Sequence, residues 1–248
     1  MNILIHGICG HMGRELAKLC TDGVRGAALV AGVDAFATDG VTYTSFEGVK
    51  NVSDIDCIID FSFHTAVAGV LDFAVKNSIP AVIATTGLTD EERQGIYEAA
   101  KSIPVFHSAN MSLGIALLTE LAKKAAAAMP DAEIEIIEKH HDRKLDAPSG
   151  TALMIADALR EVRPEAYNHL GRAGMAKRDA REIGIHAVRM GNIIGEHEVM
   201  VGTNNQTITL KHEAHSRALF AEGALAAAQF IIGKDAGLYE MKDIVRER

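Results

Sequence analysis

The segment NILIHGICGHMG, residues 2–13, decides the fold of this chain. It begins with a short apolar run typical of a buried strand, and Gly7, Gly10 and Gly13 follow before helical spacing sets in. Strand, glycine loop and helix in this order indicate a dinucleotide-binding turn. Gly7 permits the tight turn, Gly10 lets a pyrophosphate approach the backbone, and Gly13 allows the helix to pack against the strand. The phosphates are then expected at the N–H groups that open the helix.

An acidic residue supports this interpretation. The glycine spacing is GxxGxxG rather than the commoner GxGxxG, so the pattern alone is weak evidence. Asp34, however, ends the next predicted strand, 21 residues beyond Gly13, where an acidic side chain binds ribose hydroxyls. Ala35 follows, where an arginine would be needed to meet a 2′-phosphate, so the sequence favours NADH over NADPH. A Rossmann-like core whose glycines serve only turns stays open as the alternative.

The rest of the first half alternates strands with helices. Thr89 and Glu92 form a capping-box pattern at the start of one of the helices. Alternation with short connections predicts a Rossmann-like, doubly wound parallel sheet, hence an α/β protein. The predicted strands cover 2–6, 28–33, 56–61, 80–85 and 104–107, and the predicted helices 14–20, 66–76 and 90–101.

The alternation of strands and helices ends near residue 109. A long apolar helix is expected over 113–129, then a strand over 133–137 and a helix beginning just after Pro148. Three strand-like runs without intervening helices and a final alanine-rich helix complete the chain. We therefore expect an α+β domain over 110–216, inserted into a dinucleotide-binding domain made of 1–109 plus 217–248. The three runs cover 183–190, 196–201 and 207–213, and the final helix covers 217–232.

Composition excludes several classes of function. The 248 residues include 25 basic and 33 acidic side chains, no Trp and only 5% aromatics, which argues against a nucleic-acid partner. Cys9, Cys20 and Cys57 show no CxxC pairing and are expected to be free thiols in the cytoplasm. The predicted strand directly after Met1 leaves no room for a signal peptide, and the most apolar stretch, 223–232, is too short to cross a bilayer. We expect neither export nor membrane insertion.

The densest polar cluster is KHHDRKLDAPSGT, residues 139–151. His140, His141 and Lys144 lie within five residues at a strand exit, where they can bind carboxylates and supply protons near neutral pH. A helix opens just after them, and the N–H groups of Gly150 and Thr151 are expected to point at an anion. A cationic loop that leads into a helix N-terminus predicts a receptor for a small, negatively charged substrate.

Two other interpretations of this cluster are open. Paired histidines beside Asp142 could bind a metal, but there is no HExxH spacing and no cysteine partner. Adjacent residues on an extended backbone also point to opposite sides, so we expect no metal. The other alternative is a merely solvated polar loop. The remaining histidines are expected to be structural or surface residues.

The stretch EKHHDRKLDAPSGTA, residues 138–152, resembles the signature of the dihydrodipicolinate reductase family, also called 4-hydroxy-tetrahydrodipicolinate reductase, of the diaminopimelate branch of lysine biosynthesis. Further segments are similar to family landmarks in the same order, so the resemblance covers nearly the whole chain. They are GICGHMG at 7–13, DFS at 60–62, ATTG at 84–87, SANMSLG at 108–114, GEHE at 195–198 and Ser216-Arg217.

The resemblance implies NAD(P)H-dependent reduction of 4-hydroxy-tetrahydrodipicolinate, via dihydrodipicolinate, to tetrahydrodipicolinate. It implies a homotetramer in which the inserted domain binds the dicarboxylate substrate and supports oligomerisation. By the same resemblance, His140 is the catalytic proton donor and acceptor and Lys144 a proton donor, while His141, Gly150 and Thr151 bind substrate carboxylates. The implied cofactor contacts are Gly7, Ile8, Cys9, Gly10, His11, Met12, Asp34, Ala84, Thr85, Thr86, Ser108, Ala109, Asn110 and Met111.

The chain departs from the family pattern at four positions, none of them in the proton-transfer set. Ala35 stands where many members carry arginine, and Ala84 replaces the first glycine of GTTG. Met111 replaces an aromatic residue and Ala116 an asparagine. Another two-domain dehydrogenase, an NAD-sensing protein and a reductase-like protein without turnover remain alternatives. The first gives no reason for an HHxxK sequence that leads into a PSGT helix start. The second would typically add a DNA-binding module with a basic face, which the acidic balance and the chain order do not show. The presence of His140, His141 and Lys144 argues against the third.

Overall fold

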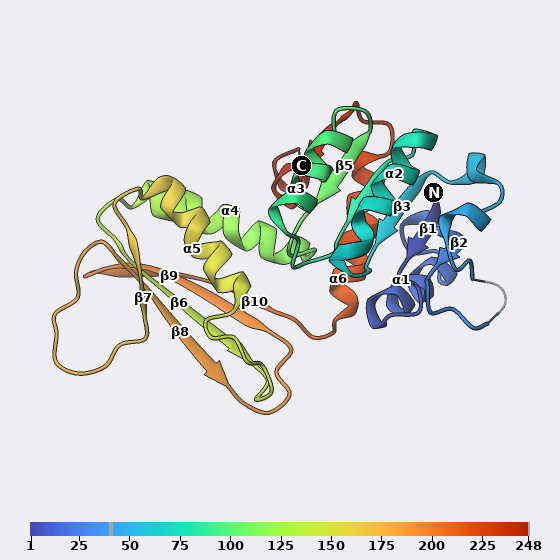
Figure 1. The fold of residues 1–248 in the computed structure, drawn as a ribbon. Coiled ribbons are helices and arrows are strands. Elements are labelled where there is room, and N and C mark those ends of the chain that lie inside the picture. The colour runs from blue at the N-terminus through green and yellow to red at the C-terminus, as the bar shows by residue number, and fades with distance from the viewer. Residues whose placement is uncertain (40–41, 248) are drawn as a thin grey trace. The chain divides into compact units, whose positions relative to one another are not determined.

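The computed structural model describes residues 1–39 and 42–247. The chain forms two compact units, shown in Figure 1. The first unit comprises Met1–Leu113 and the chain from Arg217 onward, and the second comprises Gly114–Ser216. Each unit has its own sheet and its own apolar core.

The first unit has a six-stranded sheet with the strand order β11-β5-β4-β3-β1-β2, and all its described strand pairs are parallel. The reversal of strand order on the two sides of β1 makes this a doubly wound sheet, which confirms the Rossmann-like prediction. The strands are β1 (Asn2–His6), β2 (Ala28–Val33), β3 (Cys57–Asp60), β4 (Ala81–Ile83), β5 (Pro104–His107) and β11 (Gly237–Tyr239).

Helices cover this sheet because its central strands are apolar on both faces. Helices α2 and α3 share a core with Leu4, Ile58 and Val105, whereas α1 and α6 pack against each other. The rings of Phe106 and Phe230 meet edge to face with centroids 6.5 Å apart, and they link α6 to the sheet. The helices are α1 (His11–Thr21), α2 (Val67–Asn77), α3 (Asp90–Ala99), α6 (Ala218–Ile231) and α7 (Met241–Glu247), with short 3₁₀ turns at Val24–Gly26, Phe46–Gly48, Val52–Asp54 and His64–Ala66.

The second unit is an α+β domain built on a five-stranded sheet with the order β10-β9-β6-β8-β7. Strand β6 runs parallel to β8 and antiparallel to β9. Helices α4 and α5 pack on the face that carries Ile136, Ile185 and Val199, and both lie on the same side of the sheet in Figure 1. The elements are α4 (Leu113–Ala128), β6 (Glu133–His140), α5 (Gly150–Val162), β7 (Tyr167–Leu170), β8 (Glu182–Arg189), β9 (Glu196–Thr203) and β10 (Gln206–Glu213).

The structure adds three elements that the sequence pattern did not predict, and each is short. β7 and β11 are edge strands of four and three residues with no fully buried position, so they lack the apolar alternation that signals a strand. α7 is a single short helix near the C-terminus. β6 also continues three residues beyond the predicted strand, to His140, because its polar end is hydrogen-bonded inside the unit. The capping box of Thr89 and Glu92 is confirmed.

Candidate functional site

The first unit gathers the predicted nucleotide-binding segments at one edge of its sheet. The parallel register aligns His6 with Asp60, Asp60 with Ile83, and Ile83 with His107. The glycine loop and the segments 84–86 and 108–111 therefore leave the sheet side by side. The pairing of β1 with β2 brings Asp34 to the same edge. Ligands of doubly wound sheets bind at the carboxyl ends of the strands, where the strand order reverses, as it does here at β1.

The glycine loop has the shape that the sequence predicts. Gly7 has a φ of 79°, and a Cβ atom there would lie 2.8 Å from the carbonyl oxygen of Phe61. A Cβ atom at Gly13 would lie 2.2 Å from the carbonyl oxygen of Gly7, so α1 can approach β1 only with glycine there. Gly10 is the N-cap of α1 and offers no side-chain cap, and the first turn holds no acidic residue. The opening N–H groups of α1 are therefore suited to a phosphate.

Asp34 is only 7% exposed, and two backbone N–H groups hold its carboxylate in place. The N–H of Cys9 donates to Oδ2 and the N–H of Phe36 donates to Oδ1, both at 2.9 Å. The Cys9 thiol is a third hydrogen-bond partner of this carboxylate, which leaves acceptor capacity for a ribose hydroxyl. Burial and the nearby carboxylate of Asp34 raise the pKa of the Cys9 thiol, so this cysteine stays protonated at neutral pH.

A buried carboxylate of the DFS segment, to which the sequence analysis gave no role, connects three strand ends of the first unit. Asp60 is fully buried, and its Oδ1 lies 2.7 Å from Nδ1 of His6 and accepts a hydrogen bond from Ser62 Oγ at 2.6 Å. Its Oδ2 accepts from Thr85 Oγ1, also at 2.6 Å. The hydroxyl of Thr85 is therefore engaged inside the protein, which leaves its backbone for a cofactor. The signal for Asp60 was its position at the end of a buried strand.

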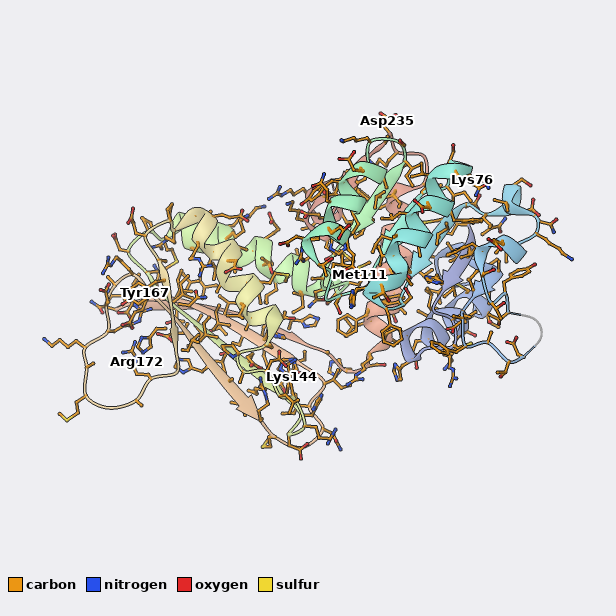
Figure 2. All side chains as sticks on the ribbon, viewed as in Figure 1. Lys76, Met111, Lys144, Tyr167, Arg172 and Asp235 are labelled. Carbon is orange, nitrogen blue, oxygen red and sulfur yellow. The ribbon has the colours of Figure 1, made fainter. Side chains whose placement is uncertain are left out.

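The remaining predicted cofactor residues differ in exposure. Thr86 and Ala109 are exposed, whereas Ala84 and Met111 are buried. The carbonyl of Met111, a residue labelled in Figure 2, packs against α6 at Gly223, where a Cβ atom would lie only 1.7 Å from that oxygen. A direct cofactor contact of the Met111 side chain stays a prediction.

In the second unit, strand β6 places its polar end beside the start of α5. Alternate residues of β6 are buried, so Glu138 and His140 share the face that Ile134 and Ile136 occupy further along the strand. His140 Nδ1 lies 2.6 Å from Glu138 Oε2. Glu138 is fully buried, and it also accepts hydrogen bonds from Arg189 and from the N–H of Ser149. Strand pairing explains the first of these, because Arg189 is the β8 partner of His140.

These hydrogen bonds decide the charge of Glu138. Burial by itself raises the pKa of this carboxyl group, but hydrogen bonds from His140, Arg189 and Ser149 outweigh burial and lower the pKa to about 2. The same contact raises the pKa of the Arg189 guanidinium. The second unit therefore holds a buried, fully ionised carboxylate that is bound to a cation on one side and to a histidine on the other.

In the loop between β6 and α5, a lysine forms an ion pair with the carboxylate of Asp146, a residue of the same loop. Lys144, labelled in Figure 2, places its Nζ 2.8 Å from Oδ1 of Asp146. Lys144 is the main cause that lowers the pKa of Asp146, and the backbone of Gly150 lowers it further. A lysine and the first N–H group of a helix together thus stabilise a carboxylate. This is the arrangement that the sequence predicts for an anionic substrate.

Ser149 and His197 complete this region. Ser149 caps α5, because its Oγ accepts a hydrogen bond from the N–H of Ala152, and the same Oγ lies 3.2 Å from His197 Nε2. Burial, followed by the charge of His140, lowers the pKa of His197 to about 4, so the ring is neutral at neutral pH. The rings of His140 and His197 meet edge to face with centroids 5.3 Å apart. His141 and Thr151 are half-buried.

Residues 1–39 and 42–247 contain neither a metal-binding cluster nor a membrane-spanning helix. In this part of the chain, no three His, Cys, Asp or Glu side chains lie together in a way that could hold a metal ion. No helix within it is long and apolar enough to cross a membrane.

Comparisons with known proteins agree with these observations. Residues 1–111 match the family model described as dihydrodipicolinate reductase, N-terminus, and residues 114–245 match its C-terminus. A 4-hydroxy-tetrahydrodipicolinate reductase from Caldanaerobacter subterraneus subsp. tengcongensis is 48% identical over 100% of this chain and 99% of its own length. One from Clostridium novyi is 40% identical over 99% and 98%.

Among solved structures, the chain is similar to a dipicolinate-bound dihydrodipicolinate reductase from Paenisporosarcina sp. TG-14. The TM-score is 0.83 at 27% identity, over 98% of this chain and 99% of the other. A myo-inositol dehydrogenase from Corynebacterium glutamicum, 17% identical with a TM-score of 0.60 over 96% and 90%, shares the fold.

Proposed function

The chain belongs to the dihydrodipicolinate reductase family, and on that premise we propose that it reduces 4-hydroxy-tetrahydrodipicolinate, via dihydrodipicolinate, to tetrahydrodipicolinate in the diaminopimelate pathway of lysine biosynthesis. It is an oxidoreductase. One observation carries the assignment of the substrate site: Lys144 and the start of α5 stabilise a carboxylate on the loop that directly follows His140. The Paenisporosarcina relative binds dipicolinate, a compound with two carboxylates.

The cofactor is a reduced nicotinamide nucleotide, and the first unit fits it. The uncapped first turn of α1 suits the pyrophosphate, and the carboxylate of Asp34 keeps acceptor capacity for a ribose hydroxyl. Ala35 provides no cation for a 2′-phosphate, and the carboxylate of Asp34 repels one. These residues support a preference for NADH over NADPH. The cofactor, when bound, supplies the hydride.

The second unit orients the substrate and supplies the balancing proton. Lys144, His141 and the N–H groups of Gly150 and Thr151 hold the two carboxylates and thereby fix the ring. His140 exchanges the proton that accompanies the hydride, so that a hydride and a proton together reduce one double bond, and Lys144 is a second proton donor. Removal of the Lys144 charge should therefore weaken both binding and turnover.

The assembly and the location of the protein are part of the proposal. We expect a homotetramer in which the second unit supplies the interface. In its described residues, the sheet of that unit carries both helices on one face, while Glu135, Lys139 and His186 lie half-buried on the other. Light scattering of the purified protein tests the number of subunits. A cytoplasmic location agrees with Cys9, Cys20 and Cys57, which are all free thiols.

The deciding experiment follows the absorbance of reduced nicotinamide while an upstream enzyme generates the substrate. NADH and NADPH are tested separately, with Lys144→Ala as the matched variant. Substrate-dependent oxidation that is faster with NADH and is lost in Lys144→Ala supports the whole proposal. Oxidation that favours NADPH overturns the role given to Ala35. If a folded protein that binds the nucleotide oxidises neither cofactor, the reaction assigned here is wrong.

A further inference from the structure

Glu138 has no role in the reaction as described so far, although it makes the closest contact of His140. We propose that Glu138, held by Arg189, is a positioning residue that keeps a hydrogen on Nδ1 of His140 and so leaves Nε2 to exchange the proton with the substrate. This inference rests on the proposed function, because it concerns the histidine to which that function assigns the proton. Glu138 is fully buried and makes four hydrogen bonds, one of them with His140, and Gly195 lies beside Nε2 of His140.

The contacts determine which nitrogen carries the hydrogen. Glu138 Oε1 accepts from the Ser149 N–H at 3.0 Å and from Arg189 at 2.8 Å, while Oε2 accepts from Arg189 at 2.9 Å and lies 2.6 Å from His140 Nδ1. A carboxylate that already receives three N–H donors can only accept a fourth hydrogen bond. Nδ1 must therefore be the donor, and the lone pair of neutral His140 lies on Nε2.

Arg189 makes this arrangement compatible with proton transfer. A buried carboxylate whose only charged partner was a histidine would lose its compensating charge whenever that histidine gave up its proton. The guanidinium of Arg189 is permanently charged and contacts both oxygens of Glu138, so the carboxylate stays paired in either state of His140. The histidine can then lose and regain a proton without leaving an uncompensated buried charge.

The surroundings of Nε2 agree with a role in exchange. A Cβ atom at Gly195 would lie 3.2 Å from Nε2, closer than a side chain comfortably approaches, so the glycine keeps this side of the ring clear. On another side, His197 meets the ring of His140 edge to face and directs its own Nε2 toward Ser149 rather than toward His140. Nδ1 is thus engaged within the protein, and Nε2 remains for a ligand.

The variant Glu138→Gln gives a sharp test, because the protein determines how the new amide is oriented. Two N–H donors, from Ser149 and Arg189, meet at the position of Oε1, whereas Oε2 receives one such donor, from the other terminal nitrogen of Arg189, so the amide oxygen is expected at the position of Oε1. The amide nitrogen then faces His140 Nδ1, which has to become an acceptor. The hydrogen of the neutral ring moves to Nε2, and His140 can no longer accept a proton there. We expect kcat to fall about 100-fold or more, the effect of a reversed histidine tautomer, with KM changed only a few-fold.

The chain offers a matched control on the same strand. Glu135 also contacts a histidine and an arginine: Oε2 lies 2.9 Å from His186 Nε2, and Oε1 accepts from Arg178 Nε at 3.1 Å. Its side chain is 28% exposed, and alternation along β6 places it on the opposite face from Glu138. Glu135→Gln makes the same chemical change in the same kind of trio. We expect it to leave kcat within about twofold.

The experiment combines kinetics with nitrogen NMR of the histidine rings at neutral pH. Three results support the inference: a wild-type His140 signal with hydrogen on Nδ1, its reversal in Glu138→Gln, and partial recovery of kcat in Glu138→Asp, which restores the charge at a greater distance. A wild-type ring with hydrogen on Nε2 overturns it without any variant, and so does an active wild type whose kcat survives Glu138→Gln. A wild type that oxidises neither cofactor contradicts the proposed function instead, and the NMR result still decides the tautomer.

Discussion

In its described residues, each unit of the molecule contains a fully buried carboxylate in hydrogen-bond contact with a histidine, and the two pairs differ in what else surrounds them. The nitrogen–oxygen distance is 2.7 Å between His6 and Asp60 and 2.6 Å between His140 and Glu138, and both carboxylates are fully buried. Asp60 is otherwise bound by two hydroxyl groups and the N–H of Ser62, whereas Glu138 is otherwise bound by a backbone N–H and by the guanidinium of Arg189, a permanent cation. The distance alone therefore does not distinguish a proton-transfer pair from a structural one.

The additional partners make the distinction. The hydrogen bonds of Asp60 join the end of β1 to the segments that follow β3 and β4, which stiffens the edge where the glycine loop begins. Glu138 combines a permanent cation with a histidine whose second nitrogen is kept clear by Gly195. A fixed counter-charge and an unobstructed second nitrogen are what proton exchange requires. We therefore regard the first pair as structural support for the sheet edge where the cofactor is proposed to bind, and the second as part of the proposed proton-transfer site.

Replacement of His140 and of His6 should show the largest difference in kcat between the two histidine–carboxylate pairs. His140→Gln removes the group proposed to exchange the proton, and we expect kcat to fall about 10²- to 10⁴-fold with a much smaller change in substrate KM. His6→Gln should change kcat by less than about threefold and act mainly on the KM for the cofactor. Steady-state kinetics with both substrates varied measures this. Equal losses of kcat in the two variants would remove the distinction.

Loss of the Asp60 carboxylate should reduce the stability of the first unit rather than turnover. Asp60→Ala leaves His6 and the hydroxyls of Ser62 and Thr85 without their shared acceptor inside the protein. We expect the free energy of unfolding of the first unit to fall by about 3–5 kcal/mol, the usual cost of removing one partner of a buried pair. Urea unfolding, followed by probes in each unit, measures the loss. Asp56→Ala is the control, because Asp56 directly precedes the same strand and its exposed carboxylate accepts a hydrogen bond from the N–H of Asn2. A similar loss there would contradict a specific role of Asp60.

The second unit should be the more sensitive one to mild acid. The pKa of His197 is lowered from 6.5 to about 4, so the unfolded chain binds a proton that the folded chain excludes. Stability is therefore complete above pH 6.5 and falls as the pH drops toward 4, by roughly 3 kcal/mol in total. Glu138 affects stability at a lower pH than His197. The stability that it contributes is complete above pH 4.5, the ordinary pKa of a glutamate, and is lost only as the pH falls toward its lowered pKa of about 2.

The acid effect is measured by thermal unfolding between pH 4.5 and 7. His197→Asn should flatten the dependence on pH of the second unit, although its stability at neutral pH also falls. An unchanged slope in this variant would assign the acid sensitivity to other groups.

The local motifs of both units could be predicted from the sequence, but the contacts that distinguish the two histidine–carboxylate pairs could not. The glycine loop, Asp34 and the 139–151 cluster depend on local order and spacing, and the alternation of β6 could have placed Glu138 beside His140. Arg189 lies 51 positions from Glu138, and Asp60 lies 54 positions from His6. Such contacts arise from strand pairing across a sheet, for which a single sequence carries no local signal. The edge strands β7 and β11 escaped prediction because burial does not impose a pattern on them.

The smallest expected effect concerns Asp146, whose carboxylate lies within the proposed substrate site. Asp146 contacts Lys144 at 2.8 Å and therefore competes with a substrate carboxylate for the same charge. Its side chain is 56% exposed, and such a pair contributes at most about 1 kcal/mol. We expect Asp146→Asn to lower the substrate KM about two- to fivefold with little change in kcat. Asp142→Asn is the matched control, because Asp142 pairs with Arg143 on the same loop and should leave KM unchanged. A higher KM in Asp146→Asn would mean that Asp146 orients Lys144 for the substrate rather than competing for it.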